Sequence, residues 1–86
     1  MEHRTILRLL ARDDSYKVIV EPWADEFSVT THADCRIVAL NPLTLPSFEV
    51  ELYRGALIVY VHEGGSTYEF WRDAVREFWN PIPIPF

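Results

Sequence analysis

The segment FEVELYRGALIVYV, residues 48–61, carries the clearest secondary-structure signal in the chain. Its first half alternates apolar with acidic or polar side chains, which is the period of a strand with one buried face and one wet face. Arg54 and Gly55 make a tight turn, and residues 56–61 are apolar on both faces, as in a central strand. We therefore predict a β-hairpin over residues 48–61. The side chains expected in the core are Phe48, Val50 and Leu52, and those expected in water are Glu49 and Glu51.

Upstream of this hairpin, short apolar runs predict further strands. Residues 4–11 fit either a strand or a helix, because a helix would align Arg4, Arg8 and Arg12 on one side. Turn-forming residues follow this run, and the next run is rich in β-branched and aromatic residues, which favours a hairpin of two strands. The predicted strands in this half are residues 4–11, 16–20, 26–31 and 35–40.

The segment from residue 67 to residue 79 supports two interpretations. Its apolar residues recur at helical spacing, and Ser66 stands three positions before Glu69, as in a capping box. The rival interpretation makes residues 67–71 another strand, with Gly64 and Gly65 in a hairpin loop. The periodicity favours the helix. The predicted fold is therefore mostly β, either all-β or α+β. It has an antiparallel sheet of five or six strands curled into a small barrel or sandwich, and a C-terminal helix at about 67–79 is compatible with it.

Composition limits the classes of protein and partner. A chain of 86 residues with 49% hydrophobic residues fits one globular domain, which we place at residues 1–79, followed by a strap at 80–86. Eight basic against 13 acidic residues give a formal charge of −5, which disfavours nucleic acid and anionic membranes as partners. The single cysteine excludes an intrachain disulfide. No signal-peptide pattern is visible in the sequence, so we expect a cytoplasmic protein.

The segment VEPWADEF, residues 20–27, carries a weak resemblance. It is similar to a group of small bacterial proteins in which an E-P-W segment precedes alternating, β-rich sequence. The resemblance implies a compact all-β domain of bacterial origin and supports the strand interpretation of residues 67–71. It implies no activity, cofactor or site.

Candidate chemical sites are few. His32, Asp34 and Cys35 are competent zinc ligands close in sequence, but they lack the spacing of known zinc motifs, and Cys35 fits better as a small buried residue. We therefore predict no metal, cofactor or catalytic site, with this trio as the weak metal candidate. Other combinations considered for catalysis were Cys35 with His32 or His62, Ser66 with His62 and Asp73, and Glu49 with Glu51.

The C-terminal segment NPIPIPF, residues 80–86, is unusually apolar for a chain end. Its alternate prolines remove the backbone donors from one side of an extended segment, while Ile82, Ile84 and Phe86 keep theirs on the other side. Such a segment can pair along one side only. We predict that it docks on an open sheet edge of its own domain or of a second copy, burying Ile84 and Phe86.

Three functional hypotheses follow from these observations. The leading one is a small protein-interaction module, as a homo-oligomer, an adaptor or a neutralising subunit, with the apolar tail as the partner-binding segment. The alternative is a small-molecule-binding β-barrel. A small enzyme has the least support, because the sequence shows no catalytic motif.

Overall fold

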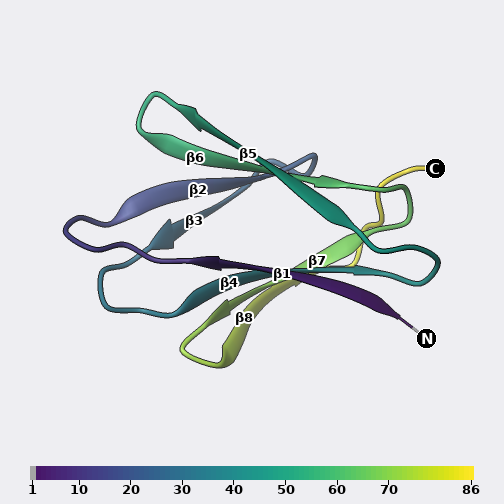
Figure 1. Cartoon of the computed structure of the whole chain (residues 1–86), viewed down its shortest axis with the longest axis horizontal. Helices are drawn as coiled ribbons and strands as arrows, with labels where there is room; N and C mark the ends of the chain where they lie inside the picture. The colour runs from purple at the N-terminus through teal and green to yellow at the C-terminus, as the bar shows by residue number, and fades with distance from the viewer. Residues whose placement is uncertain (1) are drawn as a thin grey trace.

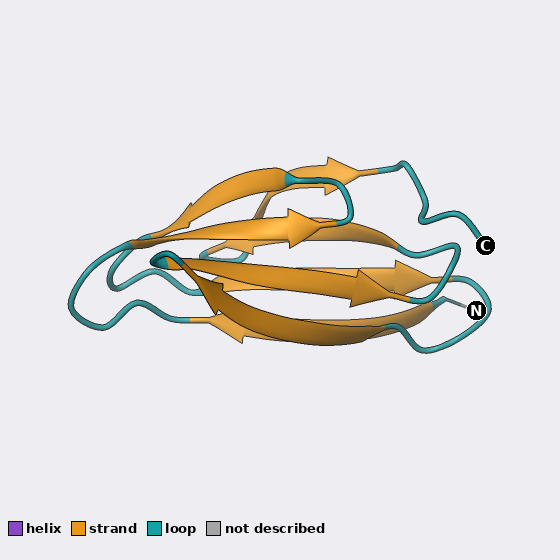
Figure 2. Cartoon of the chain, turned by 90° about the horizontal axis from the view of Figure 1, so that it is seen from above, coloured by secondary structure: helices purple, strands orange, loops and turns teal. Residues whose placement is uncertain are grey.

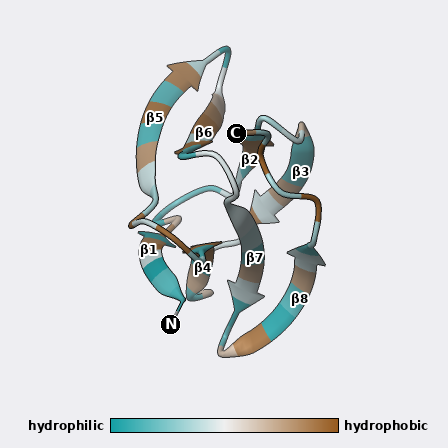
Figure 3. Ribbon diagram, turned by 90° about the vertical axis from the view of Figure 1, so that its right-hand side faces the viewer, coloured by the Kyte–Doolittle hydropathy of each residue, from teal (hydrophilic) through white to brown (hydrophobic). Residues whose placement is uncertain are grey.

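The computed structural model describes residues 2–86, and its regular structure is entirely β (Figure 1). Two four-stranded sheets pack face to face as a sandwich, one in the order β1-β4-β7-β8 and the other in the order β3-β2-β6-β5 (Figure 3). All pairs are antiparallel except β2 with β6. The strands are β1 (His3–Leu9), β2 (Tyr16–Glu21), β3 (Asp25–Val29), β4 (Cys35–Asn41), β5 (Ser47–Tyr53), β6 (Ala56–His62), β7 (Thr67–Arg72) and β8 (Val75–Asn80).

The core lies between the two sheets and is built mainly by the central strands (Figure 2). Each strand sends alternate side chains inward, so β-branched residues from one sheet meet aromatic residues from the other. Phe70 of β7 stacks on Phe27 of β3, with ring centroids 4.3 Å apart and planes 5° from parallel. Side chains therefore fill the space between the sheets. The residues with no exposed surface include Val18, Val20, Val29, Cys35, Ile37, Ala39, Val59, Tyr68 and Phe70.

The prediction of a mostly β domain is confirmed, but its finer details are wrong. Within residues 2–86 there are eight strands instead of five or six, the two sheets do not close into a barrel, and no helix forms. Residues 2–86 therefore form no closed barrel of the kind that the small-molecule-binding alternative assumes. The strand predicted for residues 4–11 is present as β1, which pairs along its whole length with β4. The hairpin predicted between this strand and residues 16–20 is wrong, because β2 lies in the other sheet and pairs with β3 and β6.

The predicted helix at 67–79 is instead the β7–β8 hairpin. Tyr68 and Phe70 belong to the core, whereas Glu69 and Trp71 are hydrogen-bonded to each other on the opposite face, so the side-chain direction alternates with a period of two rather than 3.6. As a strand, this segment pairs with the open edge of β4, which a helix could not do. The turn between β7 and β8 was not recognised from the sequence, because the two residues at positive φ are Asp73 and Ala74 instead of the usual glycine-containing pair.

The hairpin predicted over residues 48–61 is confirmed as β5 and β6, with Arg54 and Gly55 both at positive φ in its turn. The prediction that its apolar face is buried is wrong for β5. Val50 is 51% exposed and Leu52 is 79% exposed. Both face inward, opposite Val59 and Leu57 of β6, but β5 is an edge strand whose tip stands away from the other sheet (Figure 1).

The C-terminal segment docks on its own chain, at the β6–β7 loop instead of a sheet edge. The Ile84 amide donates to the Ser66 carbonyl at 2.9 Å, and the Gly65 amide donates to the Ile84 carbonyl at 2.6 Å. Trp23, packed against the core, adds a bond from its indole nitrogen to the Ile82 carbonyl at 2.7 Å. Ile84, which was expected to be buried, is half-buried and packs against the core.

The expected burial of Phe86 is wrong, since this residue is 90% exposed. Its ring lies against Gly64 and Gly65, so closely that a Cβ on either glycine would meet Phe86 atoms at 2.8 Å and 2.7 Å. Contact on this one side leaves the rest of the terminal residue in water. The two glycines, expected in the hairpin-loop interpretation to join paired strands, instead lie in a loop between the two sheets and contact the end of the tail.

Candidate interaction site

The outer face of the β1-β4-β7-β8 sheet gathers arginine and tryptophan side chains on a chain that is acidic overall. Because inward positions alternate with outward ones, the core residues of these strands fix which side chains point to solvent. We call this surface the arginine–tryptophan face. It consists of Arg4, Ile6 and Arg8 on β1, Asp34, Arg36 and Val38 at the start of β4, Glu69 and Trp71 on β7, and Arg76 and Trp79 on β8.

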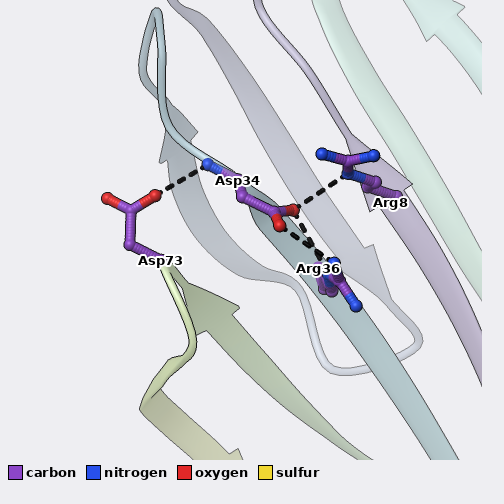
Figure 4. Close-up of polar contacts among 4 residues, drawn as sticks. All are labelled: Arg8, Asp34, Arg36 and Asp73. Atoms are coloured by element: carbon purple, nitrogen blue, oxygen red, sulfur yellow. Dashed lines mark hydrogen bonds and ion pairs between the residues drawn. The ribbon is translucent and has the colours of Figure 1, made fainter.

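Asp34 organises one half of this face (Figure 4). Its carboxylate accepts from Arg8 Nε at 3.1 Å and from Arg36 Nε and Nη2 at 3.2 and 2.9 Å. Its backbone is fixed by Asp73, which accepts from the Asp34 amide and donates its own amide to the Asp34 carbonyl, both at 2.9 Å. The hydrogen bond from Arg36, with that from Arg8, holds the pKa of Asp34 below its ordinary value. One carboxylate thus holds two guanidinium groups side by side.

Glu69 organises the other half. It is only 9% exposed and accepts from the Trp71 indole nitrogen at 2.9 Å and from Arg76 Nη1 at 3.0 Å. The Arg76 guanidinium also lies over the Trp79 ring, 5.7 Å from its centroid, in cation–π contact. These contacts hold long side chains in place before any partner arrives, which reduces the entropy lost on binding.

A shallow hollow of about 290 Å³ lies between the two halves. Its lining combines apolar with charged side chains, as in sites where a few polar groups orient a mainly apolar ligand. The side chains that line it are Arg4, Ile6, Asp34, Arg36, Val38, Glu69, Trp71 and Ala74.

The charge of this face opposes the charge of the chain. Its four arginines exceed its two carboxylates, for a formal +2, while the chain carries −5. Both carboxylates already pair with arginines, so they position the cations and do not cancel them all. Trp79 remains 49% exposed and Ile6 51% exposed among these charges. Exposed tryptophan and arginine are the residues most enriched at the energetic centres of protein interfaces.

The structure separates the weak metal candidates. His32 and Asp34 line a second open hollow, but the Cys35 side chain lies fully buried in the core on the other side of the backbone. Burial raises the pKa of the Cys35 thiol, which accepts a contact from Arg72 Nη1 at 3.4 Å. Among residues 2–86, no group of three or more His, Cys, Asp or Glu side chains is placed to hold a metal ion.

The combinations considered for catalysis do not assemble either. Ser66 Oγ donates to the backbone carbonyl of His62, at 3.2 Å, and accepts from Asn41 Nδ2, at 2.9 Å. It is thus a buried structural hydroxyl without an imidazole partner, and Asp73 binds the Asp34 backbone at another site. Glu49 and Glu51 are solvent-exposed, as the sequence predicts.

Most of this face was not predicted from the sequence. Arg4 and Arg8 were noted only for the side that they would share with Arg12 in a helix, and Arg36 was not singled out. In the predicted helix, Trp71 and Trp79 would share the apolar face that packs on the core, and Arg76 would lie on the polar side. The available signal was the alternation of large outward side chains over residues 67–71, which becomes informative only once that segment is assigned as a strand.

A comparison with models of protein families, with curated proteins and with solved structures gives no match to this chain. In the part of the chain that the structure describes, no helix has the length and apolar character to cross a membrane. The role of Ile82, Ile84 and Phe86 in binding a partner stays a prediction.

Proposed function

We propose that this domain is a protein-interaction module that binds an acidic partner surface through the arginine–tryptophan face. The observation that carries the proposal is the concentration of four arginines and two tryptophans on one face of a chain with net charge −5. A basic face attracts an acidic patch on a partner and repels basic surfaces. It therefore increases the specificity of binding and the rate of association. The half-exposed Ile6 on β1 and Trp79 on β8 supply apolar area on the two edge strands of the face.

The same residue types also occur on faces that bind single-stranded nucleic acid, but the details favour protein. Such faces need open aromatic rings and unopposed cations. Here the Trp71 indole is bonded to Glu69, one side of the Trp79 ring faces Arg76, and three of the four arginines of the face are already paired with carboxylates. The tail supports a partner role less directly, because the backbone amide and carbonyl of Ile84 are already bonded to the chain's own β6–β7 loop.

The proposal is tested with a displayed library of random short peptides, selected on the wild-type protein. We expect enrichment of peptides that combine aspartate or glutamate with an aromatic or aliphatic anchor. Binding of the enriched peptides should weaken about tenfold or more in the double variant Arg36→Glu/Arg76→Glu, as expected for residues at an interface centre.

The matched control is Arg12→Glu/Arg54→Glu, which changes net charge by the same amount at two exposed positions off this face. It should retain peptide binding. Peptides without acidic enrichment, or peptides that bind both variants equally, would overturn the proposal. So would tight binding of a single-stranded DNA oligomer that is lost in Arg36→Glu/Arg76→Glu.

A further inference from the structure

The opposite side of the sandwich has the opposite charge. On the outer face of the β3-β2-β6-β5 sheet, alternation with the buried core residues places four glutamates, three of them exposed and the fourth, Glu21, half-buried with an Oε1 that is buried and has no hydrogen-bond partner within residues 2–86. One lysine, Lys17, lies 3.5 Å from Glu26, so with His62 neutral the formal charge is −3. We call this surface the acidic face. Its carboxylates are Glu21, Glu26, Glu49 and Glu51.

The acidic face also has apolar and aromatic surface at its centre. Tyr60 donates from its hydroxyl to Glu51 at 3.2 Å, and His62 lies 2.9 Å from Glu49. Tyr53 is 55% exposed, and Ile58 is partly exposed beside it. The two faces are therefore complementary in sign and alike in having aromatic residues among their charges.

Symmetric pairing of two copies does not use this complementarity. A two-fold dimer through either face would set like charges against each other, which is destabilising. Pairing through the free edge of β5 meets the same obstacle. Antiparallel pairing of two β5 strands about Val50 places Glu49 of one copy opposite Glu51 of the other.

We infer that the acidic partner is a second copy of this chain, bound head to tail, with the arginine–tryptophan face of one copy on the acidic face of the next. The inference rests on the proposed function and names its partner. Such a contact is heterologous, so it leaves a free face at each end and adds further copies in line. Four strands about 4.8 Å apart, each about six residues of about 3.4 Å, offer roughly 400 Å² per face. The contact is therefore smaller than a stable dimer interface and depends on salt.

Two charge-reversal variants test the geometry. Arg36→Glu/Arg76→Glu makes both faces acidic, and Glu49→Lys/Glu51→Lys makes both faces basic. Sedimentation velocity measures the mean mass over a range of high protein concentrations, at about 20 mM and about 500 mM NaCl, because screening acts over the Debye length. Circular dichroism checks that each variant is folded.

Wild type at low salt should exceed twice its monomer mass of 10.1 kDa and return towards that mass at high salt. Each variant alone should self-associate about tenfold more weakly or worse. An equimolar mixture should associate again, because the native acidic face of one variant meets the native basic face of the other. Recovery only on mixing is specific to a head-to-tail contact.

A wild type that stays at the monomer mass at every concentration would overturn the inference. A mass that stops at the dimer and ignores salt would do the same, as would folded variants that assemble like wild type. If wild type is monomeric but the peptide selection still yields acidic ligands that require Arg36 and Arg76, the interaction face stands and the partner is another protein.

Discussion

Strands β4 and β5 follow one another in the chain and have opposite environments. Six of the seven residues of β4 are buried, whereas six of the seven residues of β5 are exposed. Yet β5 has the more regular alternation of apolar and acidic residues. The difference is position: β4 lies between β1 and β7, while β5 is at an edge with one neighbour. Alternation in a sequence shows which face is apolar, but coverage by another sheet determines whether that face is buried.

The largest effect should come from the strand next to β4. Phe70 of β7 has no exposed surface and stacks on Phe27. Phe70→Ala should lower the free energy of unfolding by about 3–5 kcal/mol, since it removes a buried ring and leaves a cavity. Urea denaturation followed by circular dichroism measures the loss. A decrease in the free energy of unfolding of less than about 1 kcal/mol would show that the Phe70 ring is not packed in the core.

The C-terminal end of β4 depends on a polar side chain. Asn41 has no exposed surface; its Nδ2 donates to Gly64 O at 3.0 Å and to Ser66 Oγ at 2.9 Å, and its Oδ1 accepts from two loop amides. Asn41→Ala should destabilise the protein by about 1–3 kcal/mol because it leaves the polar groups that Asn41 binds without a hydrogen-bond partner. In a double-mutant cycle, Ser66→Ala should cost less in the Asn41→Ala background than in wild type. Simple additivity would contradict the coupling.

The contribution of the docked tail to stability can be measured by removing it from the β6–β7 loop. Deleting residues 81–86 removes two backbone hydrogen bonds, the Trp23 contact and the half-buried Ile84. The expected loss is about 1–3 kcal/mol in thermal or urea unfolding. Phe86→Ala is the control, and it should change stability by less than about 0.5 kcal/mol because the ring is mostly in water. Equal stability of the truncated and full-length chains would mean that the tail does not dock.

Two leucines that face each other across the β5–β6 pair test β5 directly. Leu52 and Leu57 are register partners, but Leu52 is 79% exposed while Leu57 packs against the core. Leu52→Ala should cost less than about 0.5 kcal/mol, instead of the 2–5 kcal/mol that a buried leucine would imply. Leu57→Ala should cost more. If Leu52→Ala is the more damaging change, something covers β5 in solution.

The smallest expected effect concerns the Asp34 ion pairs. Because the folded-state pKa of Asp34 is lowered by Arg36 and Arg8, its ionised form stabilises the fold above the unfolded-state value of 3.8. That contribution is lost as pH falls through the lowered folded-state pKa. The melting temperature of Asp34→Asn should thus lie slightly below wild type near neutral pH, and the gap should close below about pH 4. Asp13→Asn, in an exposed loop, should show no such gap.

The sequence alone determined the local elements. Alternation and turn chemistry identified the β5–β6 hairpin, and the apolar run at 35–40 identified the central strand β4. The alternate prolines correctly limited the tail to pairing along one side, where Ile84 now exchanges both backbone bonds with the β6–β7 loop. These features depend on the conformations and backbone donors of neighbouring residues, which the sequence states directly.

Only the tertiary structure decided the rest. Residues 67–79 fit a helix by period, but pairing with the edge of β4 makes them strands. The same choice puts Trp71, Arg76 and Trp79 on the sheet face that also carries Arg8 and Arg36, so most of the candidate face could not be predicted before these strands were assigned. The exposure of β5 is also non-local, because it depends on how far the opposite sheet, β1-β4-β7-β8, extends over this edge strand. Each of these outcomes is a non-local contact, whose partner cannot be identified from the period of one segment.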